Sequence, residues 1–393
     1  MPAQDNIANK SQPVRVFLTG ATGVMGMAGL KELMRYPGKY KVTVLARDSK
    51  KNRRKLRDFE EKGIKIIWGD LLDAQSIREG VEGADIVLHV GGMVSPMAEH
   101  YPGKTLKVNV GSMQLIASTV KDIETRNPDR EIKVVYIGSV SQYGSKLPPH
   151  HWGKVGDELK AAKFDTYSES KILAEKALKE SGVQKWVSIR QTSILHAGLL
   201  KNINNPVIFH TPLQGVLEWI TTEDSGRLLE RVCDSTLPDT FWNKEYNAGG
   251  GEKFRRTNYE FESELLKVIG CPPPEKIFET SWFCADNFHG MWFEDSDLLE
   301  SVLHFRGDDS FEEALQRLKA TLPFYYKFTP LAPSFLIKWW MKKVAEKAPL
   351  GPLSWIKNKE MEKIEASWGS LEKYSNSPSW EELKSKPKLI RKK

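Results

Sequence analysis

The chain contains little cysteine: its 393 residues include only Cys233, Cys271 and Cys284, with no CxxC pair. We therefore expect neither a disulfide framework nor a thiolate zinc site, and a reducing, cytoplasmic compartment is the default expectation. The histidines show no HxH or HExxH spacing, so no metal site is expected. The sequence also lacks an apolar run of about 18 residues and a secretory signal, so we expect no membrane span.

Most of the chain carries no net positive charge. The formal charge is +7, and residues 331–393 account for all of it, with 14 Lys and Arg residues against 7 Glu. A neutral body argues against nucleic-acid binding, because neutralising phosphates requires a basic patch on the folded surface. With 40% hydrophobic residues, the chain can still bury a sizeable core.

Between Val14 and about Ile189, short β-branched apolar runs alternate with helical stretches. The runs are continuously apolar, which is typical of strands buried on both faces. This alternation predicts an α/β fold with a Rossmann-type, doubly wound parallel sheet. The expected strands are VRVFLTG, KVTVLAR, IKIIWGD, ADIVLHVGG, KVVYIGS and WVSIR.

Changes in composition divide the chain into three regions. We expect the Rossmann domain over residues 12–190 and a smaller unit that closes over a site at 191–322, where Asn, Pro and Gly are frequent. Some segments of the smaller unit could return to the Rossmann sheet. A basic, Trp-rich C-terminal extension is expected over 323–393.

The segment VFLTGATGVMG predicts a dinucleotide site, because a buried strand runs into Gly20, Gly23 and Gly26 and then into a helix. Gly20 permits the tight turn, Gly23 lets the backbone approach a pyrophosphate, and Gly26 allows close helix–strand packing. Backbone N–H groups at the helix start attract the anion. Thr22, Val24 and Met25 complete the expected cofactor-binding turn.

Arg47 ends the second strand, where a residue that reads the cofactor ribose belongs. A carboxylate there would repel a 2′-phosphate, whereas an arginine binds it through charge-assisted hydrogen bonds. We therefore expect NADP (NADPH) as the cofactor, with NAD less favoured. A solvated basic loop, with Asp48 close by, is the plain alternative.

Two further strand ends point to the cofactor. Asp70 and Leu71 follow the third strand, and the carboxylate could accept a hydrogen bond from an adenine amino group. Helix capping is the other interpretation, because Asp70 and Asp73 both precede a helical stretch. Gly91 follows the fourth strand, where the chain should pass close to the cofactor.

Tyr167 and Lys171 are four residues apart on an expected helix, which places both side chains on one face. An ammonium about 4–6 Å from the phenol should lower its pKa by about 1–3 units, so that Tyr167 could exchange a proton while a hydride moves. Ser139 ends a buried strand upstream, and its hydroxyl could polarise the substrate oxygen.

These motifs resemble the extended short-chain dehydrogenase/reductases, which include nucleotide-sugar epimerases and dehydratases. The resemblance rests on TGATGVMG, GDL, NVGS, GSVSQYG, YSESK and IRQTSI, and extends over about residues 14–320. It implies Ser139, Tyr167 and Lys171 as the catalytic set, with Lys171 and Tyr167 also contacting the cofactor. Asn109 matches an asparagine that positions a water in many relatives, although a buried structural role fits it nearly as well. Gln191, expected at the cofactor, stands where a proline is usual.

The expected function is an NADP-dependent interconversion of a carbonyl and a secondary alcohol on an apolar small molecule of the steroid, terpenoid or aromatic ketone type. Arg47 favours it, because relatives with an internal redox cycle usually carry an acidic residue there. The alternative is a nucleotide-sugar epimerase or dehydratase, and a non-catalytic NADP-binding scaffold is a third reading. His196 could face the substrate. Arginines that could grip a diphosphate are Arg227, Arg231, Arg255 and Arg256.

The C-terminal extension places apolar residues among lysines. Helical spacing should gather much of the apolar set on one side, the pattern of a segment lying in a membrane interface. The competing interpretation is a lid that packs over an apolar substrate pocket. Peripheral membrane contact and a homodimer, the latter by analogy with the fold, both remain open. The apolar residues are Phe335, Leu336, Trp339, Trp340 and Val344, and the lysines are Lys338, Lys342, Lys343 and Lys347.

Overall fold

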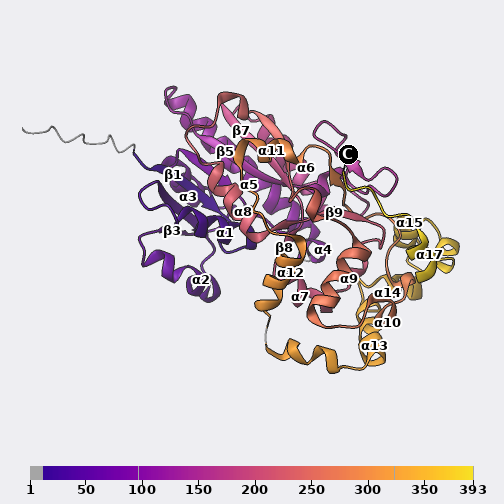
Figure 1. The fold of residues 1–393 in the computed structure, drawn as a ribbon. Helices are drawn as coiled ribbons and strands as arrows, with labels where there is room; N and C mark the ends of the chain where they lie inside the picture. Colours follow the sequence, from indigo (N-terminus) through magenta and orange to yellow (C-terminus); the bar gives the residue numbers. More distant parts are fainter. Residues whose placement is uncertain (1–11, 96, 323, 393) are drawn as a thin grey trace, which may run out of the picture.

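A seven-stranded, all-parallel sheet forms the centre of the computed structural model, which describes residues 12–95, 97–322 and 324–392 (Figure 1). The strand order β11-β7-β5-β4-β1-β2-β3 confirms the Rossmann-type, doubly wound sheet. All six predicted strands are present. The strands are β1 (Val14–Thr19), β2 (Tyr40–Ala46), β3 (Lys65–Trp68), β4 (Ile86–His89), β5 (Lys133–Ser139), β7 (Lys185–Gln191) and β11 (Lys244–Ala248).

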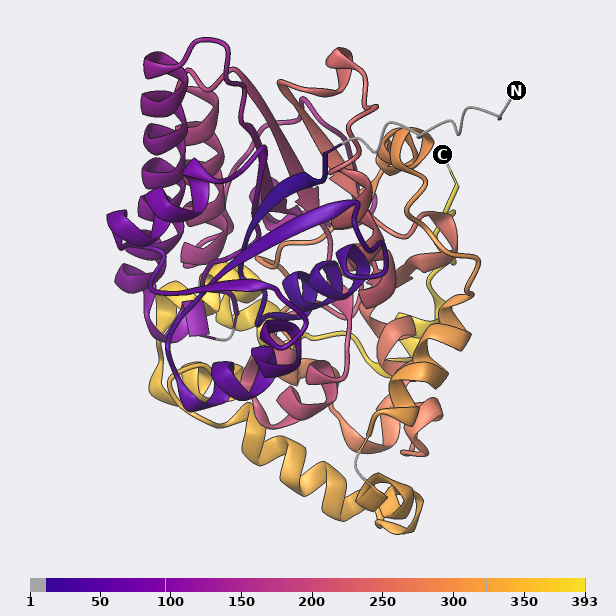
Figure 2. The same ribbon diagram turned by 90° about the vertical axis from the view of Figure 1, so that its left-hand side faces the viewer.

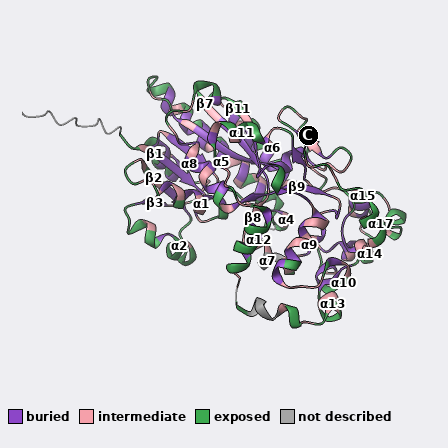
Figure 3. Cartoon of the chain, in the orientation of Figure 1, coloured by how far each residue is buried: buried purple, intermediate pink, exposed green. Residues whose placement is uncertain are grey.

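Helices cover both faces of this sheet, as continuous apolarity in the strands requires. On one face, Leu30 of α1 (Val24–Leu33) and Leu229 of α8 (Thr222–Arg231) share a buried cluster with the strands, and α11 (Ser296–Leu303) joins them. The other face is covered by α3 (Ala74–Glu82), α5 (Pro102–Arg126) and α6 (Thr166–Lys179). Figure 2 shows α5 and α6 side by side along one edge, and Figure 3 shows the buried sheet between its helices.

The sheet gains its seventh strand from beyond residue 190. β11 pairs in parallel with β7, with Tyr246 opposite Ile189. α8 also returns and packs on α1, the helix that follows the glycine turn. The sequence left open such returning segments. They tie residues 222–248 directly to the sheet that positions the site.

A second core lies beside the sheet. It includes the antiparallel pair β9 (Val216–Glu218) and β12 (Arg255–Thr257), together with α9 (Asn258–Ile269), α10 (Pro274–Ile277) and α12 (Phe311–Ala320). Glu218 and Arg255 form a buried ion pair of 2.8 Å at its centre. Because removing one partner of such a pair leaves an uncompensated charge, this contact fixes how the strands pair.

Among the described residues, the C-terminal extension contains five α-helices, and the first and last of them pack side chains on the second core. The five helices are α13 (Ser334–Ala345), α14 (Pro352–Asn358), α15 (Met361–Trp368), α16 (Leu371–Ser375) and α17 (Trp380–Ser385). Trp355 and Trp368 are buried with Cys284, and the Trp368 indole donates to the Phe283 carbonyl oxygen at 3.1 Å. Within the described part of the chain, no helix is both long and apolar enough to cross a membrane.

Candidate active site

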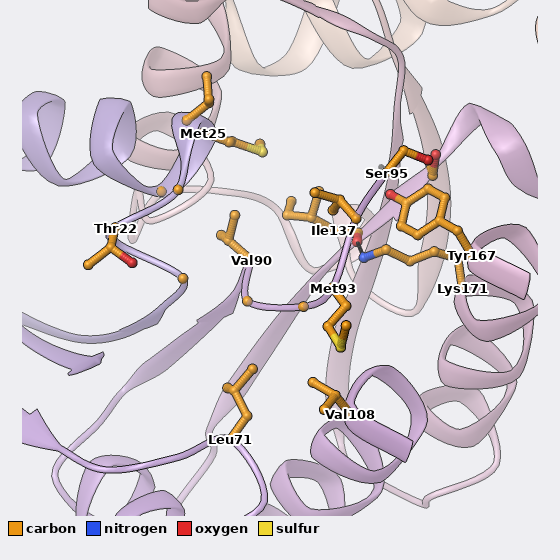
Figure 4. Close-up of a pocket in the computed structure, with 18 of the residues that line it drawn as sticks. Thr22, Met25, Leu71, Val90, Met93, Ser95, Val108, Ile137, Tyr167 and Lys171 are labelled. Carbon is orange, nitrogen blue, oxygen red and sulfur yellow. Dashed lines mark hydrogen bonds between the residues drawn. The ribbon is translucent and has the colours of Figure 1, made fainter. Parts of the chain in front are cut away.

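A cleft of about 1020 Å³ lies at the carboxyl ends of the parallel strands, the edge at which ligands bind in such sheets. Every residue predicted to be catalytic or cofactor-binding lines it, except Asn109. Figure 4 shows the glycine turn at one end of this cleft and the Tyr167 and Lys171 side chains at the other. The predicted residues that line it are Gly20, Thr22, Gly23, Val24, Met25, Gly26, Arg47, Asp70, Leu71, Gly91, Ser139, Tyr167, Lys171 and Gln191.

The glycine turn is sterically required at two positions. Gly20 has φ +77°, and a Cβ there would lie 2.7 Å from the backbone nitrogen of Gly91. A Cβ on Gly26 would lie 2.3 Å from the Gly20 carbonyl oxygen, so only glycine lets α1 start this close to β1. Gly23 caps α1 without a side-chain hydrogen bond, which leaves the first N–H groups of the helix directed at the cleft.

At the ribose end, the basic residues expected in a loop instead begin helix α2 (Lys50–Glu60), and Asp48, just before this helix, is already paired. Arg53 Nε donates to Asp48 Oδ1 at 2.6 Å, and the Arg53 guanidinium lies 4.6 Å from the Trp68 ring centre. Arg47 is exposed and lines the cleft. Arg47 therefore lines this end of the cleft, whereas Asp48 does not and is paired with Arg53.

The sequence left two roles open for Asp70, contact with an adenine amino group and capping of the next helix, and the structure gives the capping role to Asp73. Asp73 is the N-cap of α3, with its carboxylate accepting from Gln75 N and Ser76 N. Asp70 lines the cleft and accepts from Leu72 N at 3.0 Å, which orients its carboxylate within the turn. Asp70 is thus not needed as the helix cap.

Ser139 is held by a buried polar network beneath the turn that follows β5. The Gln142 side chain accepts from Ser139 N at 2.8 Å and donates to Glu175 at 3.0 Å. Glu175 in turn pairs with Arg190 on β7 at 2.6 Å. Although burial alone would raise it, the Arg190 guanidinium holds the pKa of the Glu175 carboxyl below its usual value. The network connects Gln142 of GSVSQYG with Arg190 of IRQTSI through Glu175.

Tyr167 and Lys171 project from α6 toward β5, but the expected lowering of the Tyr167 pKa is wrong for this structure. Burial raises the pKa of Tyr167 to about 12, although a hydrogen bond with Ser139 opposes the rise. The Lys171 ammonium donates to the Ile137 carbonyl oxygen at 2.7 Å (Figure 4), and burial lowers its pKa to about 8. Desolvation of the phenol, together with the carboxylates of Asp165 and Glu99, outweighs the hydrogen bond with Ser139.

Asn109 lies behind the cleft, in α5. Its Oδ1 accepts from Met93 N at 2.7 Å, and its Nδ2 donates to Met93 O at 3.0 Å and to Ser170 Oγ at 2.8 Å. The amide therefore fastens the loop after β4 to α5 and α6. This is the structural role that the sequence left as the alternative to positioning a water.

Two oxygens at the end of β7 lack hydrogen-bond partners within the described part of the chain. Gln191 Oε1 and Thr192 Oγ1 are both buried, and both residues line the cleft. The Gln191 Nε2 group donates to Ser225 Oγ at 3.1 Å, which fixes the orientation of the amide. A buried polar oxygen without a partner costs free energy, so these two atoms indicate a polar ligand group.

The cleft also contains two histidines, one of which the sequence did not single out. His196 lines the cleft as expected, with Nδ1 accepting from Gly198 N at 3.0 Å. His289 lies 2.6 Å from Asp165, the N-cap of α6. Only the tertiary fold brings His289 to α6, so no local motif could have identified it.

The four arginines considered as diphosphate ligands are engaged elsewhere, and none lines the cleft. Arg255 pairs with Glu218, and Arg256 pairs with Glu264 at 2.8 Å. The remaining two, Arg227 and Arg231, pair with Asp224 and Glu230 of their own helix α8. Besides Lys171, the lysines that line the cleft are Lys104 and Lys107.

Comparisons with known proteins identify similar sequences and folds. Residues 16–194 match the model of the NAD dependent epimerase/dehydratase family. A protein of Aspergillus hancockii, named Non-canonical nonribosomal peptide synthetase hkm10, is 28% identical over 193 residues, or 42% of this chain. The chain spans about a quarter or less of the length of the curated relatives that it matches.

Solved structures share the fold over most of the chain. The UDP-N-acetylglucosamine 4-epimerase of Methanobrevibacter ruminantium is 17% identical, with a TM-score of 0.60 over 79% of this chain and 98% of its own. The dTDP-glucose 4,6-dehydratase DesIV of Streptomyces venezuelae, solved with NAD, is 19% identical, with a TM-score of 0.62 over 78% of this chain and 96% of its own.

Proposed function

We propose that this chain interconverts a secondary alcohol and its ketone by hydride transfer, as an enzyme of the short-chain dehydrogenase/reductase type, because residues 16–194 match the model of the NAD dependent epimerase/dehydratase family. The observation that carries the proposal is the cleft itself. It joins a glycine turn at one end to Ser139, Tyr167 and Lys171 at the other. A dinucleotide of the NAD type is long enough to contact the glycine turn and the catalytic side chains at the same time.

The residues present fit such a cofactor. The open start of α1 and the close-packed Gly20 and Gly26 suit a pyrophosphate, and Asp70 suits an adenine amino group. At the far end, Gln191 Oε1 would accept a hydrogen bond from the carboxamide of the nicotinamide. When bound, the nicotinamide supplies or accepts the hydride.

The cofactor is proposed to be NADP(H). Arg47 faces the cleft at the ribose end, while the neighbouring Asp48 is occupied by Arg53. A forked guanidinium matches a 2′-phosphate in charge and geometry. The solved structures that resemble the chain include several with NAD, so the comparison of the two nucleotides is the decisive titration.

In the reductive direction, Tyr167 donates the proton to the carbonyl oxygen of the substrate. Its raised pKa keeps the phenol protonated at neutral pH, so it is ready to act as the acid. The Ser139 hydroxyl donates a second hydrogen bond to the same oxygen. The Lys171 ammonium stabilises the phenolate that remains on Tyr167 after the proton has left.

For the substrate, the first candidate is a small ketone or alcohol that lacks a diphosphate, of the steroid, terpenoid or aromatic type. The arginines of the second unit are all paired with carboxylates, and Met93, Val94, Val140 and Ile194 contribute apolar side chains to the cleft. A nucleotide sugar is the second candidate, and it is the one that the comparisons favour. It is supported by the solved structures, many of which are nucleotide-sugar epimerases or dehydratases, and by Lys104 and Lys107.

A substrate panel tests this proposal. Apolar ketones, apolar secondary alcohols and UDP- or dTDP-sugars would be incubated with the full chain and NADP(H) or NAD(H). Nicotinamide absorbance reports net reduction, and chromatography of the sugars reports epimerisation or dehydration. Turnover of a ketone supports the first candidate, and turnover of a nucleotide sugar alone selects the second. Cofactor binding without turnover of any substrate in the panel contradicts both.

A further inference from the structure

Helix α13 carries two apolar faces on opposite sides. Its inward face packs on the second core through Met341, Val344 and Ala345, which are buried. With 3.6 residues per turn, the opposite face presents Phe335 and Trp339, which are 70% and 61% exposed. Val344 therefore does not belong to the outer set, contrary to the grouping predicted from the sequence.

The outer face forms a continuous apolar surface, which we call the α13 patch. It consists of Phe335, Leu336, Trp339 and Trp340, and Leu331, 77% exposed, extends it before the helix starts. Figure 2 shows α13 along the outer edge of the molecule, with no other element outside it. A large exposed apolar patch on a protruding helix indicates an interaction surface.

The charges around the α13 patch are predominantly positive. Lys342, Lys343 and Lys347 are exposed in the turns that follow the aromatic residues. The nearby carboxylates are Glu346, which is 2.9 Å from Lys343, and Glu279, which pairs with Lys338. Two lysines of this group therefore have no ion pair within the described part of the chain.

We propose that the α13 patch docks the protein on an anionic lipid surface. A convex row of Phe, Leu and Trp side chains suits the boundary between headgroups and acyl chains, and the lysines suit anionic headgroups. Charge argues against a second copy of the chain as the occupant. A two-fold contact through the patch would bring the lysines of one copy toward those of the other.

The position of the patch makes it separable from the proposed activity. No residue of 323–393 is among the described residues that line the cleft, so changes in α13 leave the catalytic side chains in place. The patch residues are exposed, and substitutions there avoid the buried cluster that holds α14 and α15. A truncation before α13 would instead remove Trp355 and Trp368 and thereby expose Cys284, which packs on them.

Vesicle binding of the full chain tests the proposal, with phosphatidylcholine vesicles compared with phosphatidylcholine–phosphatidylserine vesicles. We expect co-sedimentation with the anionic vesicles at low salt, release at high salt, and a blue shift of tryptophan fluorescence on binding. Phe335→Gln combined with Trp339→Gln should weaken binding at least about tenfold, because most of the inserted apolar area is lost. Lys342→Glu combined with Lys343→Glu should weaken it by at least about fivefold for each lysine.

Matched variants on other surfaces serve as controls. Phe164→Gln replaces an aromatic residue of similar exposure, and Lys121→Glu combined with Lys244→Glu makes the same charge change elsewhere. Both should bind vesicles as the unmodified protein does. Absence of binding to anionic vesicles at low salt, or equal losses in patch and control variants, would overturn the proposal. A dimer that dissociates in the Phe335 and Trp339 variant, without vesicle binding, would identify a second copy instead.

Discussion

The ammonium group of Lys171 donates a hydrogen bond to the carbonyl oxygen of Ile137 at 2.7 Å, and its nitrogen lies 5.9 Å from the centre of the Tyr167 ring. Ile137 lies two residues before Ser139 on β5. One backbone carbonyl thus anchors the lysine between the strand that carries the serine and the helix that carries the tyrosine. The charge of Lys171 stays near the phenol without a direct bond to it.

This placement predicts a pH dependence of ketone reduction. Burial lowers the pKa of Lys171 to about 8, so its charge is present below that pH and is lost as the pH rises through it. Because the charge stabilises the Tyr167 phenolate formed by proton donation, the reduction rate should fall above about pH 8. Lys171→Arg keeps a charge throughout this range, so the alkaline fall in its pH–rate profile should disappear. An unchanged fall in that variant would exclude Lys171 as its source.

Arg47→Ala should remove most of a preference for NADPH over NADH. Loss of the paired charge should weaken NADPH binding by about 10- to 100-fold while NADH binding changes little. Fluorescence titrations of both nucleotides measure this. Arg54→Ala is the matched control, because Arg54 is exposed in the following helix α2 but does not line the cleft. Equal affinities of the unmodified protein for the two nucleotides would refute the assignment of Arg47.

Gln191→Leu should weaken cofactor binding by about tenfold, because the amide oxygen no longer accepts from the ligand. The substitution also removes the bond from Gln191 to Ser225, so Ser225→Ala separates the two effects. The Ser225 variant should retain nearly normal affinity in calorimetric titrations. A similar loss in both variants would show that Gln191 acts only through Ser225.

Arg190→Met should destabilise the fold by about 3–5 kcal/mol, because it leaves Glu175 buried without its ion-pair partner. Urea denaturation of the cofactor-free protein measures the free energy of unfolding. Arg78→Met breaks a partly exposed pair with Asp122 and should cost no more than about 1 kcal/mol. Equal costs for the two variants would mean that the Arg190 network does not support the turn at Ser139.

Much of the cofactor end could be predicted from the sequence, because its determinants are local. Gly20, Gly23 and Gly26 occur within seven residues, and the strand that precedes them identifies itself by continuous apolarity. Tyr167 and Lys171 are one helical turn apart and required only the helix between them. Such short-range patterns do not depend on how distant segments pack.

The remainder of the site depends on contacts between distant parts of the chain. His289 reaches Asp165 across 124 positions, and β11 joins β7 although more than 50 residues separate them. The Tyr167 pKa was predicted with the wrong sign, because burial of the phenol depends on the packing around it. Likewise, Val344 lies on the buried face of α13 because the second core covers that side, which periodicity alone cannot show.

The central claim is that Tyr167 transfers the proton while the cleft binds the cofactor, and one pair of measurements tests it most directly. Turnover of the best substrate from the panel and NADPH affinity would be measured for the unmodified protein and for Tyr167→Phe. We expect turnover to fall at least about a hundredfold, the usual scale of a lost general acid, with NADPH affinity nearly unchanged. Turnover close to that of the unmodified protein in Tyr167→Phe would contradict the account.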